Sequence, residues 1–300
     1  MTNTATPAAL YLANLSEGSQ GMRQPLDVIA GILDPDHDAD SYPWETVTYR
    51  ESMAVRQALT ERYKPSTVNK MLSAFRGVLK QTWRLGLIDS DTYHRAAAVE
   101  NVRASNLLSG RALKVEEISQ LFEVCAADET AKGARDAAIL AVFYGCGLRR
   151  GELAKLDVDD YDPEDGSILV EGKRRKQRLV YLTEYGQAHL DHWLRHRGHA
   201  PGPLFTPIRQ NGEIPLSCMR GESISYILKR RQKQAGVEPF SPHDVRRSTV
   251  THLLEAGVDV CTVQKIAGHA STTTTARYDR RDERIKRRVV EVLSFPGPSA

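Results

Sequence analysis

The clearest helical pattern in the first hundred residues runs over 66–85. Apolar side chains recur there at helical spacing, at Val68, Met71, Leu72, Phe75, Val78 and Leu79. This spacing predicts an amphipathic helix with one buried face, an N-cap at Ser66 and a stop at Gly86. The opposite face is basic, with Lys70, Arg76, Lys80 and Arg84. Such a face is by itself more often solvated than bound to phosphate.

Weaker apolar patterns over 8–15, 25–33 and 48–59 also favour helices, so the chain up to about residue 100 is predicted to be all-helical. Residues 101–113 (NVRASNLLSGRAL) have no steady period. We therefore predict a helical domain over 1–105, a linker over 106–111 and a second domain over 112–300.

The second domain combines helices with a β-hairpin. Helical patterns cover 115–126 and 132–144, after which SILVEGK and RLVYLT have strand-like composition and flank a short basic turn. Helical patterns then resume over 184–197, 222–235, 242–256, 260–267, 272–279 and 282–293. The predicted fold class is mainly α with a small β-sheet or hairpin in the C-terminal domain (α+β).

The composition, 41% hydrophobic and 26% charged, is that of a soluble globular protein. No apolar run approaches the roughly 18 to 20 residues that cross a bilayer, and the first residues lack a secretory pattern, so we expect a cytoplasmic protein. The four cysteines form no CxxC pair and lie mostly in apolar helical surroundings, which predicts reduced, buried thiols.

The net charge of +3 does not by itself identify a nucleic-acid partner. Residues 1–106 carry 11 basic and 12 acidic side chains, and the remainder carries 30 and 26. The slight basic excess therefore lies in the second domain.

That domain also contains the residue types that phosphodiester cleavage requires: a nucleophile, cationic donors for the phosphate oxygens and an acid for the leaving oxygen. Arg149 and Glu152 are three residues apart, which places them on one face of a short helix, where the glutamate can orient the arginine. His243 and Arg246 have the same spacing near a helix start. His269 lies nine residues before Tyr278. Each pair taken singly is more often an ordinary surface feature.

Together, in this order, these motifs resemble the tyrosine recombinase family, also called the phage integrase family. YGCGLRRGELAKLDVDD is similar to the family's first box, EGKRRKQRLVYL to its β-hairpin, and PHDVRRSTVTHLLEAGVDVCTVQKIAGHASTTTTARYDR to its second box. The resemblance covers roughly residues 112–293. It implies a catalytic set of Arg149, Lys173, His243, Arg246, His269 and the nucleophile Tyr278, with Glu152 holding the first arginine.

The chain departs from the family pattern at two places. Arg174 replaces a glycine that usually follows the hairpin lysine, which leaves Lys176 as an alternative to the favoured Lys173. Val245 and Arg247 replace the Leu and His that commonly flank Arg246. Spacing from His243 selects Arg246, so Arg247 is set aside as a catalytic residue, as is Arg150.

The resemblance implies a site-specific DNA recombinase that acts through a 3′-phosphotyrosyl intermediate and a Holliday junction, without metal, ATP or another cofactor. Its implied partners are double-stranded DNA with a recombination site, a homotetramer assembled on that DNA and accessory DNA-bending proteins. The basic face at Lys70, Arg76, Lys80 and Arg84 then becomes a candidate DNA contact. The basic final helix, 282–293, can pack in cis or against a neighbouring subunit.

Two alternative functions stay open. One is an architectural or regulatory DNA-binding protein of the same fold that does not cut, and the other is a type IB topoisomerase. A metal-dependent phosphatase is disfavoured, because no carboxylate and histidine cluster has metal-ligand spacing.

Overall fold

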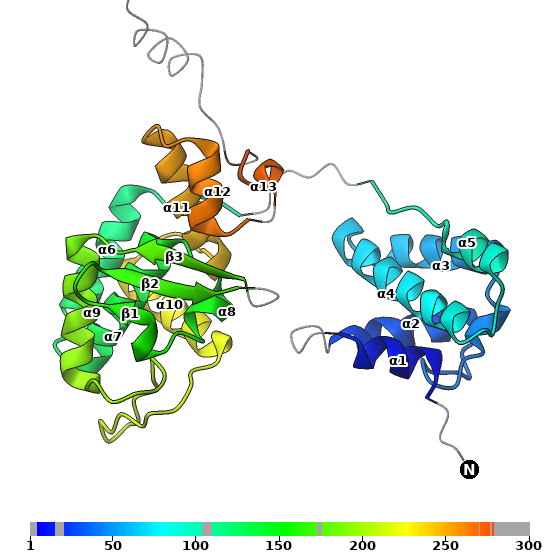
Figure 1. Cartoon of the computed structure of the whole chain (residues 1–300), viewed down its shortest axis with the longest axis horizontal. Helices are drawn as coiled ribbons and strands as arrows, with labels where there is room; N and C mark the ends of the chain where they lie inside the picture. The colour runs from blue at the N-terminus through cyan, green and yellow to red at the C-terminus, as the bar shows by residue number, and fades with distance from the viewer. Residues whose placement is uncertain are drawn as a thin grey trace, which may run out of the picture. The chain divides into compact units, whose positions relative to one another are not determined.

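The computed structural model describes residues 5–15, 21–103, 110–172, 176–269, 271–276 and 278. It divides the chain into two compact units, Met1–Leu107 and Leu108–Ala300 (Figure 1). Lys173 and the predicted helix over 282–293 lie outside the described residues. A mainly helical chain with a small antiparallel sheet in its second unit is confirmed.

The described part of unit 1 is helical throughout. Its elements are α1 (Pro7–Ala13), α2 (Arg23–Leu33), η2 (Trp44–Thr46), α3 (Tyr49–Arg62), α4 (Pro65–Arg84) and α5 (Ser90–Ala97). The predicted apolar face of α4 forms the centre of the core and packs on the buried Trp44. The predicted Ser66 N-cap is wrong by two residues: Lys64 is the N-cap and Pro65 begins the helix, because the fixed φ of proline suits a first helical position.

Unit 2 packs helices around a three-stranded sheet. Its helices are α6 (Val115–Ala126), α7 (Ala131–Cys146), α8 (Arg150–Leu153), η3 (Val158–Asp160), α9 (Glu184–Arg197), α10 (Gly221–Ala235), α11 (Pro242–Glu255), α12 (Val260–Ala267) and α13 (Thr272–Ala276). Most of α7 is buried, and it packs against α6, α9 and α11. This central helix therefore organises the core on which the second half of the chain is built.

The sheet has the order β1 (Tyr161–Asp162), β2 (Ser167–Glu171) and β3 (Gln177–Tyr181), all antiparallel. The predicted hairpin is β2–β3, in register from Ser167 opposite Tyr181 to Glu171 opposite Gln177. β1 was not predicted, because two residues are too short to show an alternating pattern. The last predicted helix within the described residues is shorter than expected, since α13 ends at Ala276 and Tyr278 follows in a turn.

The prediction of four buried cysteines is half wrong. Cys125 and Cys146 are buried, and burial raises the pKa of both thiols to about 12. Cys218 and Cys261 are exposed, the first in a stretch without regular structure and the second in the first turn of α12. All four are free thiols.

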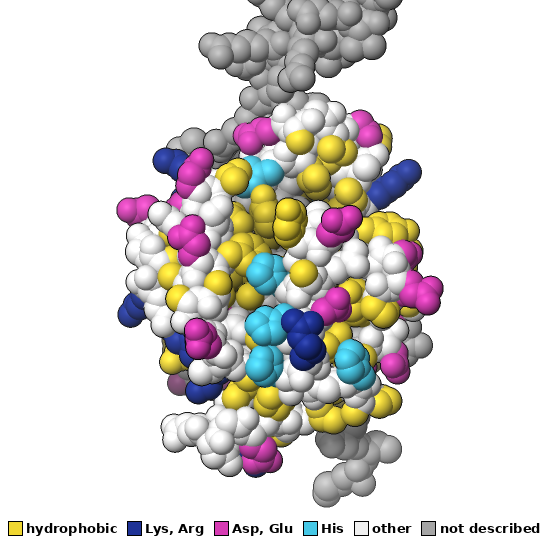
Figure 2. Space-filling view, turned by 90° about the vertical axis from the view of Figure 1, so that its left-hand side faces the viewer, with side chains coloured by type: hydrophobic (Ala, Val, Ile, Leu, Met, Phe, Trp, Pro, Cys, Tyr) yellow, Lys and Arg dark blue, Asp and Glu magenta, His cyan; other side chains and the backbone are white. Residues whose placement is uncertain are grey.

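None of the helices in the described ranges is long and apolar enough to span a membrane. Figure 2 looks onto the side of unit 2 where α9 lies and shows histidine side chains gathered there. α9 itself carries three histidines, His189, His192 and His196. Lys and Arg side chains are scattered over this view, so it presents no basic patch among the described residues.

Candidate active site

Arg149 is placed by the end of α7. Gly147 adopts a left-handed conformation (φ 57°) that ends the helix, the buried Leu148 anchors the next residue, and Arg149 becomes the N-cap of α8. Its Nη1 donates to Glu152 Oε1 (2.6 Å) and its backbone N–H donates to Oε2 (2.9 Å). Nη2 donates to the carbonyl of Gly268 (2.7 Å). The guanidinium is thus held from two sides while 46% of the side chain stays exposed.

Glu152 holds this part of the site together. Its buried carboxylate also accepts hydrogen bonds from Arg178 at 2.8 and 3.3 Å. Burial alone raises the pKa of a carboxyl group, but the hydrogen bonds and positive charges of Arg178 and Arg149 more than offset it, so the pKa of Glu152 lies below its ordinary value. Glu152 is therefore ionised at neutral pH and orients both arginines.

Arg178 was missed by the sequence reasoning. It lies on β3, and its Nε donates to the carbonyl of Ile266 in α12 (3.0 Å). The residue thereby ties the hairpin, α8 and the end of α12 together. A signal was present in QRLVY: strand alternation puts Arg178 on the same face as the buried Val180, and an arginine on an inner face requires a partner.

Arg246 comes from α11, which starts at Pro242 as predicted. A capping box between Ser241 and Asp244 begins the helix. Arg246 is 3% exposed, and its Nη1 donates to the carbonyl of Gly147 (2.6 Å). Its Nη2 is buried and has no hydrogen-bond partner among the described residues. Burial, and then the charge of Arg149, lowers the pKa of Arg246 to about 10, and these effects outweigh the opposing charge of Glu152.

Arg149, His243 and Arg246 line one cavity of about 470 Å³. The other lining residues are Leu148, Arg150, Gly151, Ser241 and Pro242. His243 is exposed, and partial loss of hydration together with the charges of Arg246 and Arg247 lowers its pKa. A cavity lined by two guanidinium groups favours an anion with several acceptor oxygens.

His269 lies just after Gly268, whose left-handed conformation (φ 62°) ends α12. Its Nδ1 makes a 2.8 Å hydrogen bond with the hydroxyl of the buried Thr275, a residue that the sequence reasoning did not single out. Burial, followed by the charges of Arg246 and Arg149, lowers the pKa of His269 to about 4. The imidazole is therefore neutral at pH 7, and when the Thr275 hydroxyl donates to Nδ1 the ring carries its proton on Nε2.

Tyr278 is partly buried within its own unit. Its ring stacks near His269, with centroids 6.2 Å apart and planes at 24°. It also packs on the apolar cluster of Val250, Leu254, Val263 and Ala267, and Arg247 Cζ lies 5.4 Å from its ring centroid. The structure thus brings the Tyr278 ring close to His269 and to Arg247 of α11, all in the same chain.

The hairpin lysine cannot be placed, because Lys173 lies outside the described residues. Lys176 is described, and its carbonyl accepts a hydrogen bond from the backbone N–H of Gly172 (2.8 Å). This bond continues the β2–β3 pairing one step beyond Glu171 and Gln177, toward the turn.

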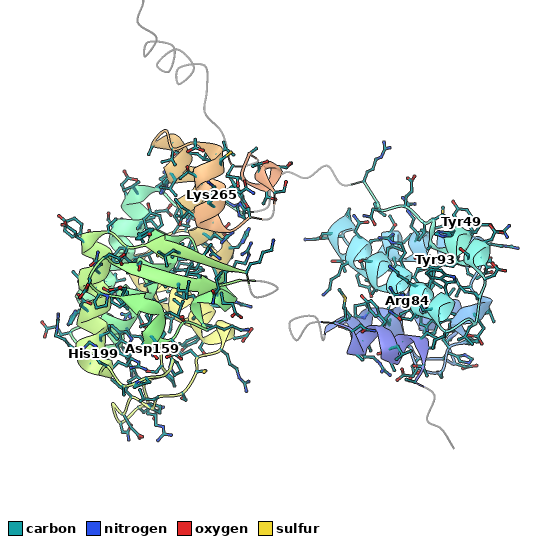
Figure 3. The ribbon with its side chains drawn as sticks, viewed as in Figure 1. Tyr49, Arg84, Tyr93, Asp159, His199 and Lys265 are labelled. Carbon is teal, nitrogen blue, oxygen red and sulfur yellow. The ribbon has the colours of Figure 1, made fainter. Side chains whose placement is uncertain are left out.

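The predicted basic face of α4 divides into two kinds of residue. Lys70, Lys80 and Arg84 are exposed. Arg84 is labelled in Figure 3. Arg76 instead donates to the carbonyl of Val99 (2.9 Å) and to Asn101 Oδ1 (3.0 Å), so its guanidinium secures the chain after α5.

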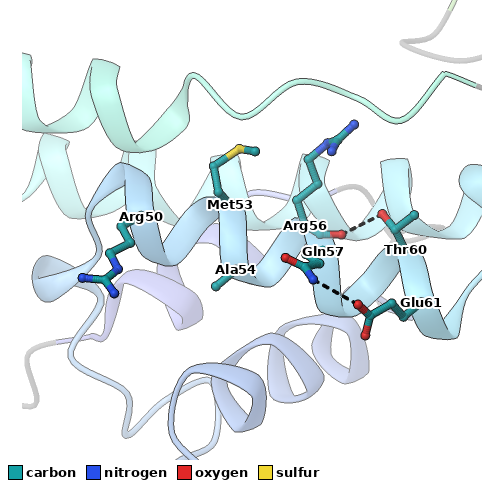
Figure 4. Close-up of a pocket in the computed structure, with 7 residues that line it drawn as sticks. All are labelled: Arg50, Met53, Ala54, Arg56, Gln57, Thr60 and Glu61. Carbon is teal, nitrogen blue, oxygen red and sulfur yellow. Dashed lines mark hydrogen bonds between the residues drawn. The ribbon is translucent and has the colours of Figure 1, made fainter.

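Unit 1 also has a groove of about 490 Å³ along α3, which the sequence reasoning did not single out (Figure 4). It is lined by Arg50, Met53, Ala54, Arg56, Gln57, Thr60 and Glu61. Figure 4 shows the Gln57–Glu61 hydrogen bond and the bond from the Thr60 hydroxyl to the Arg56 carbonyl, both of which run along the helix.

Comparison with known proteins identifies the family of the chain. Residues 111–284 match the model of the phage integrase family. The chain is 30% identical to tyrosine recombinase XerC of Alcanivorax borkumensis over 81% of this chain and 78% of that protein, and 36% identical to tyrosine recombinase XerD of Mycobacterium leprae over 70% and 67%. The fold is similar to that of the Tn1549 transposon integrase solved with transposon right end DNA (TM-score 0.70, 17% identity, 96% and 98% covered). The chain therefore belongs to the phage integrase family and is a tyrosine recombinase, a DNA strand-transferring enzyme of site-specific recombination.

Proposed function

We propose that this recombinase cuts one DNA strand with Tyr278, stores the cut end as a 3′-phosphotyrosyl ester and rejoins it to a strand of another duplex through a Holliday junction. The observation that carries the proposal is the single cavity that Arg149, His243 and Arg246 line together, which gathers two guanidinium groups and an imidazole around one space. The phenol of Tyr278 lies beside His269, a residue whose pKa responds to the same two arginines.

In the cleavage step, Tyr278 Oη forms a bond to the scissile phosphorus and the bond from phosphorus to the 5′ oxygen breaks. Arg149 and Arg246 stabilise the negative charge that develops on the non-bridging oxygens, an effect commonly amounting to several kcal/mol. Lys173 donates the proton that the leaving 5′ oxygen takes up. The new ester retains the phosphodiester energy, so rejoining a 5′ hydroxyl consumes no nucleotide.

The two histidines act in their neutral forms near pH 7. His243, with its lowered pKa, serves either as the base for the phenol proton or as a donor to the phosphate. His269 donates through Nε2–H to a phosphate oxygen, because its Nδ1 is engaged by Thr275. Glu152 keeps Arg149 in position.

The proposed partner is double-stranded DNA that carries a recombination site. Exchange between two duplexes requires four active sites, so we infer a homotetramer on DNA, assisted by DNA-bending proteins. Lys70, Lys80 and Arg84 are the proposed phosphate contacts of unit 1, and their contribution should weaken as salt concentration rises.

The test uses a library of overlapping nicked duplexes that together cover the source genome. Cleavage near a nick releases a short fragment, so the strand cannot be rejoined and the protein stays covalently attached. Wild type should give an adduct that survives detergent, and sequencing the trapped DNA identifies the target and the cut position. Tyr278→Phe should give no adduct. Tyr226→Phe is the matched control, since that exposed tyrosine lies on α10 outside the cavity, and it should react as wild type does.

An adduct with Tyr278→Phe would refute the proposal. DNA binding without any adduct from wild type would instead favour the architectural alternative. Supercoil relaxation without recombinant product would favour a type IB topoisomerase.

A further inference from the structure

Arg247 lies next to Arg246 on α11 but has different neighbours. Successive residues on a helix point about 100° apart, so its side chain leaves the cavity that Arg246 lines. It is 6% exposed. Its Nη1 donates to the carbonyl of Gly110 (3.0 Å), and its Cζ lies 5.4 Å from the centroid of the Tyr278 ring. One guanidinium therefore contacts both the proposed nucleophile and a residue far away in the sequence.

Gly110 belongs to a lead-in segment, residues 110–113, that is tied to α11 at several points. Asp244 Oδ1 accepts the backbone N–H of Arg111 (3.1 Å), and Ser248 Oγ accepts the backbone N–H of Leu113 (2.7 Å). The Asp244 carboxylate also lies 3.7 Å from Arg247 Nε. The lead-in segment is thus seated on the same helix turn that carries His243 and Arg246.

The contact with Tyr278 is of a kind that orients an aromatic ring. A guanidinium over the face of a tyrosine is attracted by the ring quadrupole, most strongly when the pair is desolvated. Because Arg247 is itself held by the Gly110 carbonyl and near the Asp244 carboxylate, it restricts the ring instead of following it. Displacing the nucleophile by about 1 Å can reduce a rate a hundredfold.

We propose that Arg247 is a positioning residue that holds the Tyr278 ring for attack and that makes this placement depend on the seating of residues 110–113. The proposal rests on Tyr278 being the nucleophile. The chain enters unit 2 through this lead-in segment, so a change in its seating alters the cleavage rate through Arg247 and the Tyr278 ring.

The first test replaces Arg247 by Met, which keeps most of the apolar packing and removes the charge. Single-turnover adduct formation should slow about tenfold, with DNA affinity unchanged. Arg247→Lys, which keeps a cation near the ring, should recover part of the rate. Arg197→Met is the matched control, since Arg197 is equally buried (6%) and bonds the carbonyls of Gly198, Ala200 and Pro203 instead.

A substrate with sulfur at the bridging 5′ position separates positioning from proton donation. The thiolate leaves without needing an acid, so a variant that fails to protonate the leaving group recovers on this substrate. Arg247→Met should keep its deficit, because the attacking atom is misplaced on either substrate.

The second test perturbs the lead-in segment and leaves Arg247 intact. Gly110 has φ +94°, and a Cβ there would clash with Oδ1 of Asp244 and lie 3.3 Å from Arg247 Nη2. Gly257→Ala is the control, because it has the same backbone conformation (φ +93°) with open space around its Cβ. Gly110→Ala should slow cleavage at least fivefold relative to Gly257→Ala, because it disturbs the contact between Arg247 and the Tyr278 ring.

Three outcomes decide the matter. Cleavage by Arg247→Met at the wild-type rate, or a deficit no larger than that of Arg197→Met, would overturn the proposal. Equal rates for Gly110→Ala and Gly257→Ala would overturn the dependence on the lead-in segment. If wild type and Tyr278→Phe behave alike in the adduct assay, the proposed function itself fails, and this result is distinct from the other two.

Discussion

Replacing Arg246 by Met should abolish cleavage while leaving the free energy of unfolding almost unchanged. The fall in the pKa of Arg246 to about 10 means that burial disfavours its charged form, and at about 1.4 kcal/mol per pKa unit this costs roughly 3 kcal/mol. Met removes that cost. It also removes the Nη1 hydrogen bond to the Gly147 carbonyl, a bond from a charged donor that contributes about 1.5 to 3 kcal/mol.

The two effects nearly cancel, so we expect urea unfolding of Arg246→Met to agree with wild type within about 1.5 kcal/mol. The sign follows from linkage: the unfolded chain holds the arginine proton more tightly than the native chain, so the cost is present at every pH below about 10. Sulfate stabilises folded proteins in general, so it should stabilise wild type against urea more than it stabilises the variant. Adduct formation should fall by about a hundredfold or more.

Arg231 provides the matched comparison. It is equally buried but is paired with Asp128 (2.6 Å) and Asp136 (2.9 Å). Arg231→Met leaves Asp128 without its arginine and removes one of the three arginines that pair with the buried Asp136, so it should cost about 3 to 5 kcal/mol. If the two variants lose the same stability, or if Arg246→Met loses more than about 3 kcal/mol, the reasoning from the unused donor is refuted.

Three further predictions concern the surrounding residues. Glu152→Gln leaves Arg178 without a counter-charge and should lower the free energy of unfolding by about 2 to 4 kcal/mol in urea titrations, and a loss below about 0.5 kcal/mol would contradict its role in holding the arginines. Between the ordinary pKa of a histidine and about 4, His269 is protonated in the unfolded chain but not in the native chain. The free energy of unfolding should therefore fall by about 1 to 3 kcal/mol as the pH drops through this window, and His269→Asn should flatten this pH dependence. Equal pH dependence in wild type and His269→Asn would exclude the assigned pKa. Arg76→Ala should lower the melting temperature and leave DNA affinity nearly unchanged, because its guanidinium bonds Val99 and Asn101. Lys80→Ala should leave the melting temperature nearly unchanged and reduce both DNA affinity and its salt dependence. The same pattern for both variants would show that Arg76 is not committed to Val99 and Asn101.

The fold was largely predictable because local patterns carry it. The apolar stripe of α4 and the alternation of the β2–β3 hairpin appear as periodic spacing in the sequence, and both form where predicted. The misses were short elements. β1 has two residues, and the exposure of Cys218 and Cys261 depends on which side of a turn or loop faces solvent.

The sequence predicted members for the candidate site but not the contacts that connect them. Arg149–Glu152 and His243–Arg246 are separated by one helical turn, so helix geometry alone places each pair on one face. Arg178, Thr275 and the lead-in segment were missed, because their roles depend on contacts with residues distant in the sequence or on turn geometry.

The amino-acid sequence by itself determined the helices, the hairpin and the order of the charged and titratable residues, because these depend on spacing over a few residues. Only the tertiary structure decided that Arg246 keeps an unused donor while the equally buried Arg231 is neutralised by Asp128 and Asp136. Gly147 and Arg246 are 99 residues apart, and Gly110 and Arg247 are 137 apart. Whether such distant groups meet is decided by the packing of α7 against α11 and by the seating of residues 110–113, which no local period encodes.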